Sequence, residues 1–292
     1  MIDTKKCLIC QRKNSTLHWH IDPDSGAIWV WCNGRCQRGY SIYNYCYQAG
    51  ISLSEFLNGD FDFQEATPNE VQKMEWPDKF IPLSDPRAKK ALQYLKSRGL
   101  TGQGDFYYDM EYEGIVFPLY FGSVFVGAQI RLLKPWVNKD GDTTKISTIP
   151  GTRSGLLFWN YNQENIMPNV KSIVVCEGAF NAASIQQSLN AVYGSAVQNP
   201  FKAIAASGSG ASLHQRETLK ELKDNGYKII CATDRDEAGL KALKKYTEFD
   251  CLTHFCLTDT ASDWNDELQR LGQKEFTKYF LQRIKPVYIE NK

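Results

Sequence analysis

The chain of 292 residues lacks several features that would place a protein in a class at once. It has no run of about 18 apolar residues, so we expect no membrane span. Its formal net charge is only +1, which excludes a global polyanion-binding surface and leaves a local one open. The first residues lack the apolar segment of a secretory signal. A Gly-x-x-x-x-Gly-Lys-Ser/Thr phosphate loop is also absent, which excludes an ATP-driven motor of that type.

Cysteine, by contrast, is plentiful, with nine residues. Because no secretory signal precedes them, we expect these thiols to lie in a reducing cytoplasm, where cysteines bind metal or pack rather than form disulfides. Length alone allows one large domain or two to three small ones, at roughly 100–200 residues per domain.

The middle of the chain holds two short β-branched runs that end in acidic residues. Ser172–Cys176 precedes Glu177, and the run 227–233 precedes Asp234 and Asp236. Such runs are typical of buried strands in a parallel sheet, and a helical pattern follows each one. We therefore expect βαβ units, with the acids at the carboxyl ends of neighbouring strands, where open α/β sheets place their active sites. The two helical patterns cover residues 180–189 and 240–246.

Three carboxylates at one sheet edge would repel one another unless a cation lies among them. Magnesium suits such a place, because it accepts one or two carboxylates together with water and substrate phosphates. We therefore predict that Glu177, Asp234 and Asp236 bind magnesium or manganese. The alternative is that each acid only caps the helix that follows it.

These residues resemble the two signatures of the TOPRIM domain of primases and topoisomerases. The matching stretches are Glu177-Gly178-Ala179-Phe180-Asn181-Ala182 and Asp234-Arg235-Asp236-Glu237-Ala238-Gly239, and Ser262-Asp263-Trp264-Asn265-Asp266 resembles a third stretch of the family. The form is most similar to the primase part of phage primase–helicases and to stand-alone phage or plasmid primases. The resemblance implies that Asp263 is a further catalytic acid. One position departs from the family, which usually has Asp where this chain has Asn181.

Residues 1–57 carry two close cysteine pairs, Cys7 with Cys10 and Cys32 with Cys36. Two β-rich runs between the pairs, joined by a Pro-Asp-Ser-Gly turn, predict a hairpin. Cysteine pairs beside a hairpin are the layout of a zinc ribbon, in which four thiolates bind one structural zinc ion. The two histidines at positions 18 and 20 are possible replacement ligands.

This zinc domain also resembles the N-terminal domain with which primases read the template. Trp31 and Arg35 are our candidates for template contacts, because rings and cations together stack bases and follow phosphates. The alternative for Trp31 is packing inside the small domain, since strand alternation puts it on the same face as Trp29.

The next two segments differ in charge. Residues 58–79 are acidic and poor in aliphatic side chains, which predicts a linker between domains. Residues 80–165 combine a basic helix, an apolar hairpin and a basic loop, and they resemble the basic subdomain that precedes TOPRIM in primases. There the resemblance assigns Arg131 and Lys145 to the template or the nucleoside triphosphate, while ordinary surface charge is the alternative. Residues 166–292 complete the chain as the TOPRIM subdomain with C-terminal helices, and the pattern there predicts a last strand at 252–257 and a terminal helix at 274–284.

The expected fold is therefore α/β, with a TOPRIM parallel sheet, an α+β basic subdomain and an N-terminal zinc ribbon. The resemblance implies a DNA primase, a nucleotidyltransferase that makes short RNA primers on single-stranded DNA from ribonucleoside triphosphates. Glu177 would complete the metal cluster or accept the attacking proton, and zinc would be structural. A replicative helicase would come from another chain, in a bacterial or phage-infected host cytoplasm. Two alternatives stay open: a TOPRIM metal-dependent nuclease, and a non-catalytic zinc-containing accessory protein that binds single-stranded DNA.

Overall fold

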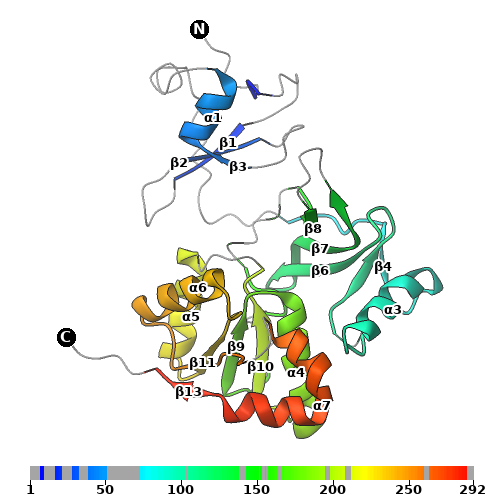
Figure 1. Cartoon of the computed structure of the whole chain (residues 1–292), viewed down its shortest axis with the longest axis vertical. Helices are drawn as coiled ribbons and strands as arrows, with labels where there is room; N and C mark the ends of the chain where they lie inside the picture. The colour runs from blue at the N-terminus through cyan, green and yellow to red at the C-terminus, as the bar shows by residue number, and fades with distance from the viewer. Residues whose placement is uncertain are drawn as a thin grey trace. The chain divides into compact units, whose positions relative to one another are not determined.

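The computed structural model describes residues 7–9, 17–21, 28–32, 39–50, 73–102, 104–137, 143–150, 152, 155, 157–162, 166–194, 198–207, 212–259 and 263–287. The chain divides into two compact units, Met1–Glu70 and Val71–Lys292 (Figure 1). Within the described ranges, no helix has the length and apolar character needed to cross a membrane.

The first unit contains a small antiparallel sheet followed by one helix. Strand β1 pairs with β2 in the register Leu17 to Cys32, so the hairpin expected between the two cysteine pairs is present. Strand β3 pairs with the other edge of β2, and helix α1 follows directly. The bounds are β1 Leu17–Ile21, β2 Ile28–Cys32, β3 Gly39–Ser41 and α1 Ile42–Ala49.

The second unit begins with a five-stranded antiparallel sheet in the order β4-β5-β6-β7-β8, called the antiparallel sheet below. Its central pair, β6 and β7, is the hairpin predicted from the apolar runs after residue 114. A short helix precedes it, and Gly99 follows this helix at φ +73°, the left-handed conformation that glycine adopts without strain. The bounds are β4 Phe80–Pro82, η1 Pro86–Ala88, α3 Lys89–Ser97, β5 Tyr107–Asp109, β6 Gly114–Phe121, β7 Val124–Val137 and β8 Thr143–Thr148.

The rest of the second unit is built on a mixed sheet in the order β10-β9-β11-β12-β13. The two β-branched runs are its central strands β9 and β11, which lie side by side and parallel, as predicted. The first four strands are parallel and the last is antiparallel to its neighbour, so the expected all-parallel sheet has one antiparallel edge. The bounds are β9 Ser172–Cys176, β10 Phe201–Ala205, β11 Lys228–Ala232, β12 His254–Phe255 and β13 Lys285–Pro286.

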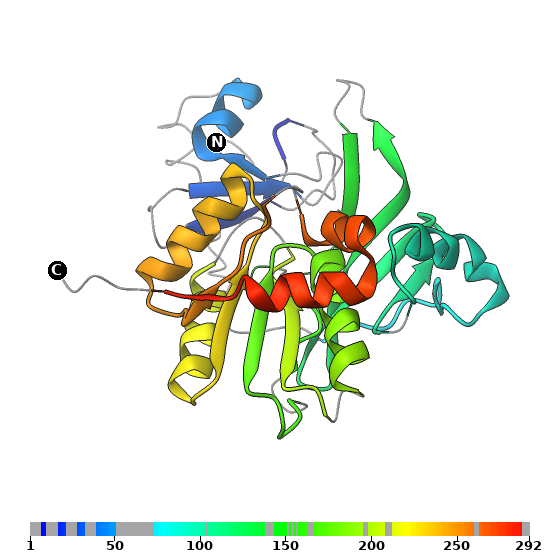
Figure 2. The same cartoon turned by 60° about the horizontal axis from the view of Figure 1, so that its bottom comes forward.

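Helices cover both faces of the mixed sheet (Figure 2). Alternate residues of the strands pack on α4 and α7 on one face, and the residues between them pack on α5 and α6 on the other. Burial on both faces explains why β9 is buried at every position and reads as an uninterrupted apolar run. The bounds are α4 Ala179–Tyr193, α5 Leu213–Asp224, α6 Glu237–Glu248 and α7 Trp264–Gln282.

The C-terminal part differs from the sequence expectation in two respects. The expected helix 274–284 is the second half of α7, which begins at Trp264 and is interrupted where Gly272 leaves the helical conformation with φ 70° and ψ 161°. The expected strand 252–257 is paired only at His254–Phe255, and its outer edge is covered by β13. Glycine has no Cβ to oppose a positive φ, so it permits the interruption without predicting it.

The two sheets of the second unit share one hydrophobic core. The Phe117 ring of the antiparallel sheet meets Phe180 of α4 at 5.3 Å between ring centroids and Trp159 at 5.7 Å. Trp159 also forms a two-way backbone bridge with Ala205, its N–H donating at 2.8 Å. Trp159 thus pairs with the end of β10 at the edge of the mixed sheet.

Residues 73–79, the end of the segment expected as a linker, pack on the antiparallel sheet. The Met74 N–H donates to the Phe125 carbonyl at 2.9 Å. The Trp76 indole lies edge-on against Tyr107 and Phe125, at 4.6 and 4.9 Å between centroids. These contacts tie this stretch to the second unit.

Candidate active site

The acidic residues lie at the carboxyl end of the mixed sheet because of its strand register. Strands β9 and β11 pair so that Cys176 faces Ala232, which brings Glu177 and the residues after β11 to the same edge. The chain runs from β9 to β10 on one side and later to β11 on the other. The edge between β9 and β11 is therefore a topological switch point, where open α/β sheets form their ligand crevices.

Asp234 is the most strongly perturbed acid at this edge. Burial and, after it, the charges of Glu177, Asp263 and Asp236 together raise the pKa of its carboxyl to about 8. The structure thus brings together the four acids named from the sequence, closely enough for each of the others to act on Asp234. Repulsion of this kind is relieved when a cation lies among the carboxylates.

Glu177 is a second acid at this edge whose carboxylate is partly buried and unfavourably placed for its charge. Burial raises the pKa of the Glu177 carboxyl, and the Asp236 charge raises it further. Its Oε2 is buried without a hydrogen-bond partner among the described residues. A buried oxygen in this state loses solvation with nothing in return, which favours a site that gains a cation or a substrate group.

Asp236 and Asp263 have a structural role as well. The Oδ1 of Asp236 accepts from the Gly239 N–H at 2.8 Å, and the Oδ1 of Asp263 accepts from the Asp266 N–H at 2.8 Å. Asp236 is therefore the N-cap of α6, as the capping alternative predicted, and Asp263 is the N-cap of α7. Each cap uses one carboxylate oxygen, so the two interpretations are compatible.

Gly239 is required by the close approach of α6 to Asp234. A Cβ built on Gly239 would lie 2.1 Å from the Asp234 carbonyl oxygen, a backbone atom that cannot move aside cheaply. We expect Gly239→Ala to lower the free energy of unfolding by more than about 2 kcal/mol and to displace the Asp234–Asp236 loop.

The measurement is denaturant unfolding, with Gly178→Ala as the matched control. A Cβ on Gly178 meets nothing within 4 Å, and its φ of −111° suits any residue. Equal stabilities for the two variants would contradict the close approach.

Asn181, the position that departs from the family pattern, lies inside this cluster. It is 4 % exposed on the first turn of α4. Its Nδ2 donates to Asp234 Oδ1 at 2.5 Å, and its Oδ1 accepts from the Asn265 N–H at 3.1 Å. The amide therefore links the loop after β11 to the start of α7.

The antiparallel sheet reaches the same edge through β7. Gln129 donates from Nε2 to the Ser207 carbonyl, and the Ser207 N–H donates to the Glu177 carbonyl at 3.1 Å. Arg131 lies two residues further along β7 on the same face, because strand side chains alternate. Its Nε is buried and has no hydrogen-bond partner among the described residues.

The second basic candidate is placed differently. Ile146 of β8 pairs with Arg131, so Lys145 is exposed on the opposite face of β8. The structure therefore does not bring Arg131 and Lys145 together. Further along β7, beyond a shift in register, Trp136 pairs with Thr144 and is 63 % exposed.

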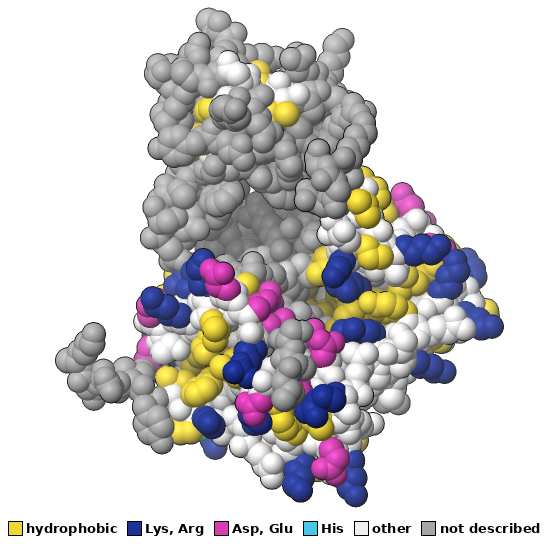
Figure 3. Space-filling view, viewed as in Figure 1, with side chains coloured by type: hydrophobic (Ala, Val, Ile, Leu, Met, Phe, Trp, Pro, Cys, Tyr) yellow, Lys and Arg dark blue, Asp and Glu magenta, His cyan; other side chains and the backbone are white. Residues whose placement is uncertain are grey.

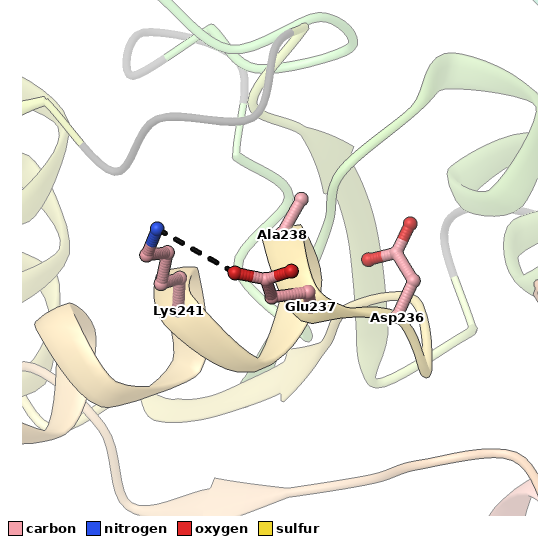
Figure 4. Close-up of a pocket in the computed structure, with 4 residues that line it drawn as sticks. All are labelled: Asp236, Glu237, Ala238 and Lys241. Atoms are coloured by element: carbon pink, nitrogen blue, oxygen red, sulfur yellow. Dashed lines mark ion pairs between the residues drawn. The ribbon is translucent and has the colours of Figure 1, made fainter.

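Beside the acids, the amino end of α6 borders an open pocket. Figure 4 shows its lining residues, with Asp236 pointing to one side of the helix start and Glu237 pointing toward Lys241. The Lys241 Nζ lies 3.8 Å from the Glu237 Oε1. Figure 3 shows acidic side chains in the middle of this face of the second unit, with lysine and arginine side chains around them.

The donor set fits a divalent cation that is completed by substrate. Within the described part of the chain, no three His, Cys, Asp or Glu side chains already form a metal-binding group. Magnesium does not need one, since it is commonly held by one or two carboxylates with water and phosphate oxygens. The buried Glu177 Oε2 and the crowded Asp234 carboxylate are the best-placed ligands.

In the first unit, the structure describes two of the four predicted zinc ligands. Cys7 and Cys32 are both fully buried, and neither is in a disulfide. Burial raises the pKa of Tyr45, a hydrogen bond and charge from Cys7 raise it further, and the charge of Cys32 adds to this. Both cysteines thus lie near one phenol. Cys10, Cys36, Arg35 and the side chain of Trp31 lie outside the described residues.

The roles of Gln129, Asn265 and the exposed Trp136 were not predicted from the sequence. Asn265 lies in the third family stretch, but an amide has no charge pattern that marks it as an anchor of the acids. Gly239 was the one available signal, because a glycine on the first turn of a helix indicates a close approach of the backbone.

Comparison with known proteins identifies one domain. The family model of the Toprim domain matches residues 172–256, from β9 to the residue after β12. This part of the chain is therefore similar to the Toprim domain. None of the curated proteins compared with the chain matches it.

Solved structures show a weaker likeness. A DnaG primase catalytic domain bound to single-stranded DNA has a TM-score of 0.49 and 20 % identity, covering 70 % of this chain and 74 % of that chain. The Escherichia coli primase catalytic core has a TM-score of 0.48 and 20 % identity, covering 70 % of this chain and 76 % of that chain. The structure of primase domains of bacteriophage T7 gp4, in a complex with the lagging-strand polymerase, has a TM-score of 0.44 and 18 % identity, covering 62 % of this chain and 83 % of that chain. At these values the likeness does not by itself establish a shared activity.

Proposed function

We propose that the protein is a DNA primase that joins ribonucleotides on a single-stranded DNA template. The observation that supports this most is the acid cluster at the Toprim edge, Glu177 with Asp234, to which the strand of Arg131 is joined through Ser207. A polyphosphate substrate needs both features, an edge that attracts divalent cations and a cation that contacts phosphate.

The chemistry is nucleotidyl transfer. The 3′-hydroxyl of one ribonucleotide attacks the α-phosphorus of the next triphosphate, and pyrophosphate leaves. A divalent cation, when bound, neutralises the charge that develops on the phosphate oxygens. Glu177 and Asp234 would hold it, and Asp236 and Asp263 would contribute charge while they cap α6 and α7.

The protein's own residues would contribute by positioning the triphosphate and the template. Arg131 would bind a phosphate of the triphosphate or of the template, which would give its buried Nε the partner it lacks among the described residues. The link from Gln129 through Ser207 to Glu177 would keep this strand in register with the acids. Lys145, on the other face of β8, would contact a different part of the nucleic acid.

The template would continue along β7 to Trp136. An indole that is 63 % exposed, on the strand that carries Arg131, is a stacking platform for an unpaired base. We expect Trp136→Ala to weaken binding of a single-stranded DNA oligonucleotide about tenfold. Trp136→Phe should retain most of the affinity, because a ring remains.

Fluorescence anisotropy of a labelled oligonucleotide measures this effect. Phe121→Ala serves as the control, because Phe121 is 57 % exposed at the far end of β6. Equal losses for Phe121→Ala and Trp136→Ala would contradict a specific stacking site.

The proposed function is tested by labelling the two nucleic acids separately. The full chain is incubated with end-labelled single-stranded DNA, labelled ribonucleoside triphosphates and Mg²⁺ or Mn²⁺. We expect short RNA products and an intact template. Shortened template without RNA would favour the nuclease, since the same acids and cation can cut a phosphodiester. DNA binding without either reaction would favour the accessory protein.

A further inference from the structure

The orientation of the Asn181 amide is fixed by its neighbours. The Asn265 backbone N–H can only donate, so the atom that faces it at 3.1 Å is the Asn181 oxygen. The Asn181 Nδ2 must then face Asp234 Oδ1, at 2.5 Å. No other hydrogen bond to Asp234 is present among the described residues.

Asn265 anchors this amide in turn. It is fully buried, and its Nδ2 donates to the Arg98 carbonyl at 2.9 Å and to the Ser184 Oγ at 2.8 Å. Arg98 is the C-cap of α3, which belongs to the antiparallel sheet's side of the unit. Asn181 and Asn265, called the asparagine clamp below, thus connect Asp234 to α3, α4 and α7.

The charge of the surroundings explains why an amide suits this position. Asp234 already lies within range of the charges of Glu177, Asp236, Asp263 and Asp266. A carboxylate at position 181 would place one more negative charge beside Asp234 Oδ1. It would also remove the only hydrogen-bond donor to Asp234 among the described residues. A neutral amide satisfies this oxygen without adding charge.

We propose that Asn181 is a positioning residue, which holds the Asp234 carboxylate for cation binding through the asparagine clamp. This inference rests on the proposed function in one respect, because the cation-assisted reaction needs Asp234. The site consequently binds its cation with one acid fewer than a carboxylate at position 181 would provide. A carboxylate there would make the fold itself depend on the cation.

The first test compares thermal unfolding of Asn181→Asp and Gln187→Glu with that of the wild type. Gln187 lies on the same helix and uses both ends of its amide, with Nε2 to the Gly99 carbonyl at 2.9 Å and Oε1 to the Thr101 N–H at 2.7 Å. In EDTA, we expect Asn181→Asp to lower the unfolding temperature by about 4 °C more than Gln187→Glu does. Millimolar Mn²⁺ should abolish this difference in unfolding temperature. Equal behaviour of the two variants in EDTA and in Mn²⁺ would overturn the proposal.

The second test is a calorimetric titration of the full chain with Mn²⁺ alone. Asn181→Ala removes the donor without adding charge, and we expect it to raise the Mn²⁺ dissociation constant about tenfold, as loss of an outer hydrogen bond does at other metal sites. Gln187→Ala should leave it within about twofold of the wild type. An unchanged constant in Asn181→Ala would overturn the positioning role. A wild type without Mn²⁺ binding would instead refute the cation chemistry of the proposed function, and the EDTA comparison would still decide on the clamp.

Discussion

Asp234→Asn is expected to have two opposite effects, a loss of primer synthesis and a gain in the stability of the cation-free protein. The substitution removes a charge needed to bind the cation, so synthesis should fall at least about a hundredfold. It also removes the carboxylate whose pKa burial and four neighbouring acids raise to about 8. The Asn181 hydrogen bond survives, because an amide oxygen can accept it as well.

The stability gain should depend on pH in a defined direction. An unfolded aspartate loses its proton near pH 4, whereas Asp234 in the cation-free fold keeps its proton to about pH 8. Between these values the folded state binds more protons than the unfolded one, so the stability of the wild type falls as the pH rises. The advantage of Asp234→Asn should therefore be small near pH 4 and largest near pH 8.

The measurement is denaturant unfolding in EDTA at pH 5 and pH 8. A shift of this size corresponds to about 5 kcal/mol in full, and solvent screening of the partly exposed carboxylate reduces our expectation to about 2 kcal/mol at pH 8. Asp250→Asn is the control, because a hydrogen bond from Lys223 lowers the pKa of Asp250 on the surface. It should bring no gain at pH 8. A wild type that is more stable than Asp234→Asn at pH 8 would contradict the crowded acid cluster.

Cys32→Ser is expected to abolish zinc binding and to unfold the first unit. Cys7 precedes the β1–β2 hairpin in sequence, and Cys32 is its last residue. Both cysteines are buried, and both raise the pKa of Tyr45. A unit of this size buries too little apolar surface to be stable alone, and a structural zinc ion contributes on the order of 10 kcal/mol to folding. Loss of one thiolate removes most of that contribution.

Metal analysis of the purified protein and limited proteolysis measure these effects. We expect one zinc ion per wild-type chain, none in Cys32→Ser, and rapid cleavage within the first unit of the variant. Cys46→Ser is the matched control, since Cys46 is buried on α1 and is not one of the predicted ligands. Zinc retained in Cys32→Ser, or lost equally in Cys46→Ser, would contradict the predicted ligand set.

The carboxyl-end position of the acids could be predicted because it depends on local pattern. Strands buried on both faces have a clear sequence signal, and the acids follow them directly, so the register of β9 with β11 brings Glu177 and Asp234 to one edge. The helices α4 and α6 were predicted for the same reason, to within a few residues at their ends.

Other features depend on contacts between distant parts of the chain. The clamp joins Asn181 to Asn265 and Arg98, residues that lie far apart in sequence and carry no spacing signal. The pairing of β13 with β12 is also a tertiary event, because two residues are too few to show an alternating pattern. Lys145 was grouped with Arg131 from the resemblance to the basic subdomain of primases, whereas the face that each occupies is set by the register of β7 with β8.

The most direct test of the central proposal is template-dependent synthesis by the wild type and by Asp234→Asn in parallel. Both proteins receive the same single-stranded DNA, ribonucleoside triphosphates and Mg²⁺ or Mn²⁺, and the products are sequenced. We expect the wild type to make short RNA complementary to the template and Asp234→Asn to make none. RNA from both proteins would contradict the assignment of the reaction to this acid cluster. Template fragments from the wild type, without complementary RNA, would contradict the primase itself.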